Sequence, residues 1–124
     1  MSKEKQLRDL IQQGDCVIAP GAYDALTARL IEQADFSCVY MTGGGTSSSF
    51  GYPDYGLLTM SGMVENAGRI VDAVDLPVIS DADNGYGNEL NVYRTIQAFE
   101  KAGVAGVHIE DQVFPKRCGH LEDK

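Results

Sequence analysis

Short β-branched runs alternate with longer helical stretches along the whole of this 124-residue chain. Strand–helix–strand order of this kind predicts βαβ units and a parallel sheet. We expect strands at residues 16–20, 37–42, 77–80 and 106–110, and helices at residues 2–13, 22–33, 59–74 and 89–102. Thr59 is a suitable N-cap for the third of these helices.

Two α/β architectures fit the alternation, the doubly wound sheet and the (β/α)8 barrel. No Gly-x-Gly-x-x-Gly follows the first strand, which weakens the dinucleotide-binding form of the doubly wound sheet. A barrel needs eight strands in about 250 residues, and four are visible. We therefore expect one domain over residues 1–124 that forms the N-terminal half of a (β/α)8 TIM barrel. The chain is expected to be truncated, because four parallel strands alone leave two unpaired edges.

Charge and cysteine content limit the partners and the compartment. The chain has 18 acidic and 10 basic residues, a formal net charge of -8, which argues against nucleic acid or an anionic membrane as the main partner. No apolar run reaches the roughly 18 residues of a membrane span. Cys16 and Cys38 lie in apolar runs and are expected to be buried. Without a signal peptide or a disulfide framework, a reducing cytoplasm is expected.

The connection from Gly43 to Leu58 is longer than the roughly 2–6 residues usual in βα units, so a lid or a binding loop is expected there. Its Thr42-Gly43-Gly44-Gly45 turn lacks the lysine of a phosphate-binding P-loop. Closely spaced backbone N–H groups can still hold a carboxylate or a phosphonate. A flexible linker is an equally good interpretation of the turn.

Acidic residues follow the third and fourth predicted strands. Strand alternation predicts that Asp81 and Asp83 lie on one side of an extended chain, and that His108 and Glu110 share a face, with Val107 and Ile109 in the helix layer. Carboxylates that converge on the rim of a parallel sheet repel one another unless a cation joins them. Oxygen ligands favour Mg²⁺ or Mn²⁺ over zinc. Helix capping or a solvated loop is the alternative for any one of these acids.

The segment Lys116-Arg117-Cys118-Gly119-His120 places a thiol among basic residues. Cations can activate a nearby thiol, so we expect Cys118 to serve as a proton donor and acceptor near neutral pH. Gly119 permits close approach, and His120 adds a second titratable partner. A surface thiol without function is the alternative.

Five ordered motifs together resemble the isocitrate lyase/phosphoenolpyruvate mutase superfamily over nearly the whole chain. They are Tyr40-Met41-Thr42-Gly43-Gly44-Gly45, Tyr52-Pro53-Asp54-Tyr55-Gly56, Asp81-Ala82-Asp83-Asn84-Gly85-Tyr86-Gly87, His108-Ile109-Glu110-Asp111-Gln112 and Lys116-Arg117-Cys118-Gly119-His120. The last motif is similar to the lyase branch, notably 2-methylisocitrate lyases. The sequence is also similar to proteins labelled carboxyvinyl-carboxyphosphonate phosphorylmutase.

The resemblance implies a role for each matching residue. Asp81, Asp83 and Glu110 match acids around a Mg²⁺ ion, for which Mn²⁺ could substitute. Thr42, Gly43 and Gly44 match a segment that binds the 2-oxo-acid carboxylate, and Thr replaces the usual Ser. The remaining matches are catalytic Cys118 on a mobile lid with Gly119 and His120 beside the substrate, active-site Asp54, and Tyr40 facing the substrate.

The activity implied is a Mg²⁺-dependent carbon–carbon lyase. It would cleave a 2-hydroxy di- or tricarboxylic acid, of the 2-methylisocitrate kind, to a 2-oxo acid and a dicarboxylate by retro-aldol chemistry. The general base is left open, with Tyr40 as a candidate. The alternatives are a carboxyvinyl-carboxyphosphonate phosphorylmutase or another phosphonate mutase, an oxaloacetate decarboxylase, and an inactive fragment. The expected partners are a small carboxylic-acid substrate and, in the full-length protein, three further copies in a tetramer.

Overall fold

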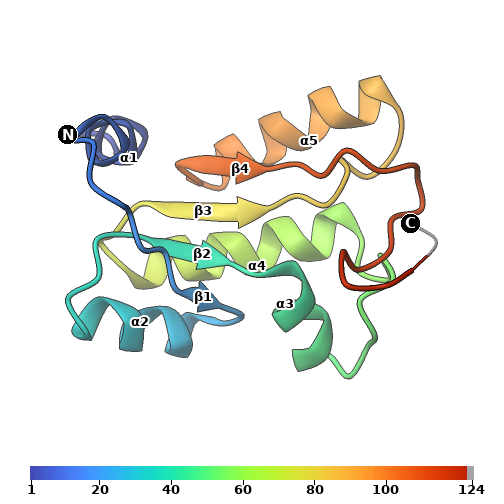
Figure 1. Ribbon diagram of the computed structural model, residues 1–124, viewed down its shortest axis with the longest axis horizontal. Helices are drawn as coiled ribbons and strands as arrows, with labels where there is room; N and C mark the ends of the chain where they lie inside the picture. The colour runs from blue at the N-terminus through green and yellow to red at the C-terminus, as the bar shows by residue number, and fades with distance from the viewer. Residues whose placement is uncertain (123–124) are drawn as a thin grey trace.

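The computed structural model describes residues 1–122. Its four strands form one parallel sheet in the order β1-β2-β3-β4, as the alternation predicts (Figure 1). The elements in chain order are α1 (Lys3–Gln12), β1 (Gly21–Ala22), α2 (Ala25–Gln33), β2 (Val39–Met41), α3 (Gly43–Ser49), α4 (Met60–Ala73), β3 (Val78–Asp81), α5 (Glu89–Lys101) and β4 (Gly106–His108).

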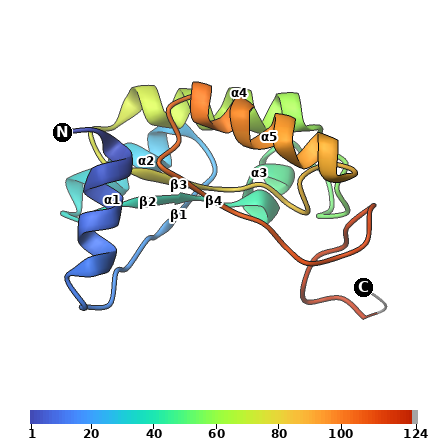
Figure 2. The same ribbon diagram turned by 90° about the horizontal axis from the view of Figure 1, so that it is seen from above.

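The main core lies between the sheet and the helices packed on it. Figure 2 shows α4 and α5 together on one face of the sheet. Buried apolar side chains from β2, β3, α2, α4 and α5 meet there, among them Met41, Val78, Ile31, Ile70 and Phe99. Thr59 caps α4 as predicted, since its side chain accepts a hydrogen bond from the N–H of Gly62. No helix in residues 1–122 is long and apolar enough to cross a membrane.

The strands point away from α1 and toward the C-terminal segment, which we define as residues 111–122 (Figure 1). The carboxyl ends of β2, β3 and β4 therefore face the connection from β2 to α4 and the C-terminal segment. This end of a parallel sheet is where side chains from successive strands can meet.

The first strand lies later in the chain than predicted. The prediction of a strand at residues 16–20 is wrong, because the pairing with β2 begins at Gly21, opposite Tyr40. Only the carbonyl of Pro20 reaches β2, where it accepts a hydrogen bond from the N–H of Tyr40. Cys16 is consequently exposed rather than buried, whereas Cys38 is buried as predicted.

The long connection after β2 begins with a helix that the sequence analysis missed. Thr42 is the N-cap of α3, and its hydroxyl oxygen accepts a hydrogen bond of 3.2 Å from the N–H of Gly45. Thr46 is fully buried, and its hydroxyl donates to the carbonyl of Thr42. The glycine-rich turn is therefore part of a buried helical turn and not a flexible linker.

Candidate active site

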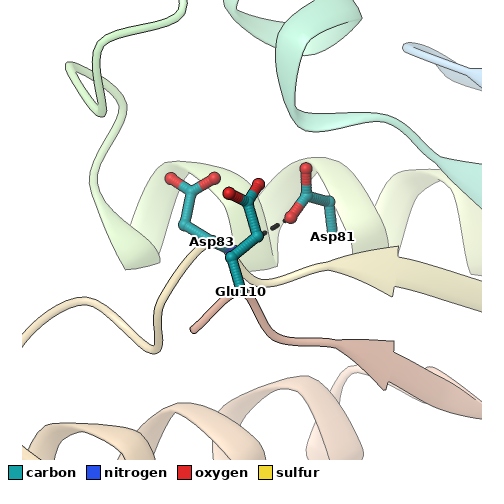
Figure 3. A group of neighbouring side chains, drawn as sticks. All are labelled: Asp81, Asp83 and Glu110. Carbon is teal, nitrogen blue, oxygen red and sulfur yellow. Dashed lines mark hydrogen bonds between the residues drawn. The ribbon is translucent and has the colours of Figure 1, made fainter. Parts of the chain in front are cut away.

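Three carboxylates converge at the carboxyl end of the sheet. Asp81 ends β3, Asp83 follows two residues later, and Glu110 follows β4. One oxygen atom from each lies within 4.8 Å of the other two (Figure 3). Asp81 and Asp83 are buried, and Glu110 is half-buried. We call these three residues the acid cluster, and the structure brings them together as predicted.

Strand alternation does not explain how the backbone brings these three carboxylates together. β3 ends at Asp81, and Asp83 has a positive φ of 48°, so the two aspartates do not lie on one extended chain. Glu110 lies beyond β4, and its N–H donates to the carbonyl of Asp83 across 2.6 Å. Ile109 is 40% exposed, so its predicted place in the helix layer is wrong, while Val107 does pack against the core.

Backbone N–H groups fix the carboxylate of Asp81 on both sides. Its Oδ1 atom accepts a hydrogen bond of 3.0 Å from the N–H of Asp83. Its Oδ2 atom accepts one of 3.2 Å from the N–H of Gly43, the first residue of α3. The Gly43 N–H is thus committed to Asp81, and the glycine-rich turn orients a member of the acid cluster.

The side chain of Lys116 enters the same site from the C-terminal segment. Its Nζ atom lies 2.9 Å from Oδ1 of Asp83, 3.1 Å from Oδ1 of Asp54 and 3.6 Å from Oε1 of Glu110. Burial lowers the pKa of Lys116, but the hydrogen bonds and charges of Asp83 and Asp54 outweigh burial and raise it above its usual value. At Asp83 burial is the larger effect and raises the pKa of the carboxyl, although Lys116 opposes it.

Lys116 is a site residue that the sequence pattern did not predict. In the sequence it is a cation beside the Cys118 thiol, whereas in the structure its ammonium group contacts the carboxylates. The signal that could have found it was the charge of the rim itself. Four acids predicted at one place, Asp54 and the acid cluster, require a buried cation to balance them.

Cys118 lies next to this network. Its backbone N–H donates to the carbonyl of Asp54 across 3.1 Å. Its Sγ atom is 3.8 Å from Nδ1 of His120, in the turn formed by Gly119 and His120. Gln112 links the segment back to the acid cluster, because its amide contacts Glu110 and exchanges two hydrogen bonds with the backbone of Arg117.

Tyr40 and His108 form a pair across the sheet. The Tyr40 hydroxyl is 3.0 Å from Nδ1 of His108. Burial, together with the negative charges of Asp81 and Glu110, raises the pKa of Tyr40 to about 12. Tyr40 is therefore a neutral phenol at physiological pH.

Thr42, Gly44 and Asp54 lie at the edge of the same site. A Cβ atom on Gly44 would stand 3.2 Å from Oδ2 of Asp54, so glycine permits the close approach of this loop. The predicted site residues Tyr40, Thr42, Gly43, Gly44, Asp54, Asp81, Asp83, Glu110, Cys118, Gly119 and His120 thus occupy one end of the sheet or the segments that fold onto it.

The acid cluster suits a hard divalent cation. All three ligand groups are carboxylates, the donors that Mg²⁺ and Mn²⁺ prefer. The hydroxyl of Tyr86 is buried and has no hydrogen-bond partner within residues 1–122. Burial raises its pKa, as do the nearby charges of Asp83 and Asp81. A polar atom of this kind can hold one of the water molecules that Mg²⁺ usually retains.

The fold is a parallel α/β sheet, and the carboxyl ends of its strands bring together a group of oxygen ligands that could hold a cation and a segment that carries a thiol. The family model described as phosphoenolpyruvate phosphomutase matches residues 7–123. The chain therefore belongs to this family, within the isocitrate lyase/phosphoenolpyruvate mutase superfamily that its motifs resemble.

Several curated relatives are lyases or mutases. The 2,3-dimethylmalate lyase of Eubacterium barkeri is 52% identical over 98% of this chain and 42% of its own length. The 2-methylisocitrate lyase of Aeropyrum pernix is 45% identical over 95% of this chain and 38% of its own length. The chloroplastic carboxyvinyl-carboxyphosphonate phosphorylmutase of Arabidopsis thaliana is 44% identical over 93% and 34%. The chain thus spans less than half the length of each of these relatives.

Solved structures share the fold. Oxaloacetate acetylhydrolase, in complex with 3,3-difluorooxalacetate, superposes with a TM-score of 0.93 and 41% identity over 98% of this chain and 42% of that one. Phosphonopyruvate hydrolase, in complex with oxalate and Mg²⁺, superposes with a TM-score of 0.90 and 36% identity over 94% of this chain and 41% of that one.

Proposed function

We propose that the protein is a Mg²⁺-dependent carbon–carbon lyase that cleaves a 2-hydroxy di- or tricarboxylic acid. The products are a 2-oxo acid and a second carboxylate. The observation that carries the proposal is the packing of the Cys118 segment against the acid cluster, through Lys116 and the backbone of Asp54. In this proposal the Cys118 thiol is a proton donor beside the cation site, and lyases named for hydroxy acids are among the relatives.

We also propose that the four βα units are the first half of a (β/α)8 barrel. The arrangement supports this because β1 and β4 stand at the two edges of the sheet, where further strands could pair. The active site would then lie at the carboxyl ends of the strands, as in other barrels. We expect the complete polypeptide to form a homotetramer in a reducing cytoplasm.

The residues divide the reaction between two faces of the substrate. Asp81, Asp83 and Glu110 would hold Mg²⁺ directly or through water, and the ion would supply stabilisation of negative charge on the oxygen of the nascent 2-oxo acid. Thr42, Gly43 and Gly44 line the site for its carboxylate, and Tyr40 lies at the same rim. A base removes the hydroxyl proton, the C–O bond becomes a carbonyl, and the carbon–carbon bond breaks. The electron pair left on the departing carbon takes the thiol proton of Cys118, with His120 beside the sulfur.

Replacement of the thiol tests this assignment. In the complete natural polypeptide, Cys118→Ser should lower kcat for cleavage by about 10²–10⁴-fold, because a hydroxyl is a poorer proton donor than a thiol. Mg²⁺ binding, measured by calorimetry, should be retained. The matched control is Cys16→Ser, which alters an exposed thiol outside the site and should leave turnover unchanged. Normal turnover by Cys118→Ser would contradict the proposal.

A phosphonate mutase is the second candidate, because the family description and one relative carry that activity in their names. It would use the same acid cluster without need of a proton donor at Cys118. A panel of 2,3-dimethylmalate, 2-methylisocitrate, oxaloacetate and phosphonopyruvate distinguishes lyase, decarboxylase, hydrolase and mutase, when release of 2-oxo acid, oxalate or phosphate and formation of phosphoenolpyruvate from phosphonopyruvate are followed separately.

A further inference from the structure

Lys116 is a buried cation carried by a different part of the chain from the acids that it contacts. Its side chain is 3% exposed, and its Nζ atom is within 3.6 Å of three carboxylates. Asp83 and Glu110 follow strands of the sheet, whereas Asp54 lies in the connection between α3 and α4. The ammonium group therefore holds the C-terminal segment against the carboxyl end of the sheet.

Two of the three carboxylates that Lys116 contacts belong to the acid cluster. Asp83 and Glu110 are candidate ligands of the divalent cation, and both already share charge with the ammonium group. Figure 3 shows how closely these acids converge with Asp81. Two cations at one small group of carboxylates repel each other, and burial strengthens that repulsion. Each cation therefore weakens the binding of the other.

The contacts of Lys116 also fix the position of the Cys118 thiol. Only Arg117 separates Lys116 from Cys118, and the backbone N–H of Cys118 is hydrogen-bonded to Asp54, which itself pairs with Lys116. A displacement of the ammonium group from the acids would therefore shift the segment that carries the sulfur.

We propose that Lys116 is a positioning residue. It holds the C-terminal segment, which carries Cys118, against the carboxylates of the cation site, and it competes with the divalent cation for Asp83 and Glu110. The competition between Lys116 and the divalent cation rests on the proposed function, since it takes Mg²⁺ as the cation. Mg²⁺ alone loosens the segment, and a bound dicarboxylate, by adding negative charge, lets both cations remain. The Cys118 thiol then returns to its position beside the acid cluster when a substrate anion is present.

Mg²⁺ titrations by calorimetry test the competition in the full chain. Lys116→Met should bind Mg²⁺ about tenfold more tightly than the parent, within the usual range of coupling between two sites. Lys116→Arg keeps the charge and should bind as the parent does. The matched control is Lys5→Met, which removes a lysine from an exposed ion pair with Asp9 and should not change the affinity. Far-ultraviolet circular dichroism confirms that each variant is folded.

Alkylation of Cys118 by iodoacetamide tests whether Mg²⁺ displaces the C-terminal segment, and it needs no substitution at Lys116. The parent for this experiment is Cys16→Ser, in which Cys38, the other thiol within residues 1–122, is buried. Saturating Mg²⁺ should accelerate alkylation severalfold, and malonate added with Mg²⁺ should slow it again. In Lys116→Met the rate should be high and independent of Mg²⁺.

Equal Mg²⁺ affinity in Lys116→Met and its parent would overturn the inference, as would alkylation that Mg²⁺ does not change. Either result leaves the lyase proposal standing. Absence of Mg²⁺ binding in every variant would overturn both proposals. Tighter Mg²⁺ binding by Lys116→Met in a protein that cleaves no hydroxy acid would support the inference and overturn the lyase proposal alone.

Discussion

The backbone N–H of Gly43 donates a hydrogen bond of 3.2 Å to Oδ2 of Asp81, which joins the first residue of α3 to the last residue of β3. A Cβ atom at position 43 would stand 2.3 Å from that same oxygen. Real Cβ atoms do not approach an oxygen so closely. Glycine is therefore required here for the close approach of α3 to the acid cluster and not for an unusual φ.

Gly43→Ala should displace the carboxylate of Asp81 and weaken Mg²⁺ binding by about tenfold or more. It should also lower the free energy of unfolding by about 1–3 kcal/mol, the usual cost of overpacking a buried site. Calorimetric Mg²⁺ titration and urea unfolding measure the two effects. The control is Gly68→Ala in α4, where a Cβ meets nothing within 4 Å and should stabilise the helix by about 1 kcal/mol. Unchanged Mg²⁺ binding by Gly43→Ala would show that Asp81 needs no such support.

Tyr40 should make stability fall as the pH rises above about 10. An unfolded tyrosine ionises near pH 10, whereas burial and the charges of Asp81 and Glu110 raise the pKa of folded Tyr40 to about 12. Between these values the folded state binds the proton that the unfolded state has lost. The contribution is therefore complete below pH 10 and disappears as the pH rises through 12.

Tyr40→Phe removes this dependence. The difference in free energy of unfolding between the parent and Tyr40→Phe, measured in urea at pH 8 and pH 11, should move against the parent at the higher pH. Tyr93→Phe, at an exposed tyrosine of α5, is the control for loss of one phenol. A difference that stays constant with pH for Tyr40→Phe would contradict the burial argument.

The sheet and the acid cluster could be predicted because both follow from short-range pattern. Alternating strand and helix composition fixes a parallel order, and carboxyl ends of neighbouring parallel strands meet at one edge. The pattern predicts that Asp81, Asp83 and Glu110 lie together, although it does not predict the turn at Asp83. The left-handed φ of Asp83 has no signal in the sequence, because Asp adopts this conformation only occasionally.

The features that escaped prediction depend on long-range contacts. β1 is two residues long and is set by its pairing with β2, so an apolar run just before it misled the analysis. α3 consists of Gly, Thr and Ser residues that favour helices poorly. Its buried Thr46 and its contact with Asp81 stabilise it instead. Lys116 could reach solvent or the acids, and only the fold decides between them.

Asn66 should stabilise the packing of α4 against the rim. It is buried, and its Nδ2 atom donates to the carbonyl of Tyr23 across 2.9 Å and lies 3.4 Å from Oγ1 of Thr46. Asn66→Leu keeps the branched arrangement of the four side-chain heavy atoms but leaves these acceptors without their donor, which should lower the free energy of unfolding by about 1–3 kcal/mol. Urea unfolding measures the loss. Glu65→Leu, on the exposed side of the same helix, should change stability by only about 0.5 kcal/mol or less.

A polypeptide of residues 1–124 alone should bind Mg²⁺ but show no measurable lyase activity. The acid cluster and its supports, Gly43 and the N–H of Asp83, all lie within this sequence. The relatives named above are more than twice as long, since the chain covers 42% of the dimethylmalate lyase, 38% of the methylisocitrate lyase and 34% of the phosphorylmutase. In a complete barrel, side chains from further strands would hold the rest of the substrate, and without them the reacting atoms are not oriented.

Calorimetry with Mg²⁺ and an assay of 2-oxo-acid release from 2,3-dimethylmalate and 2-methylisocitrate separate the two properties. Turnover by this polypeptide would show that four βα units suffice for catalysis, whereas failure to bind Mg²⁺ would show that the acid cluster needs support from outside them.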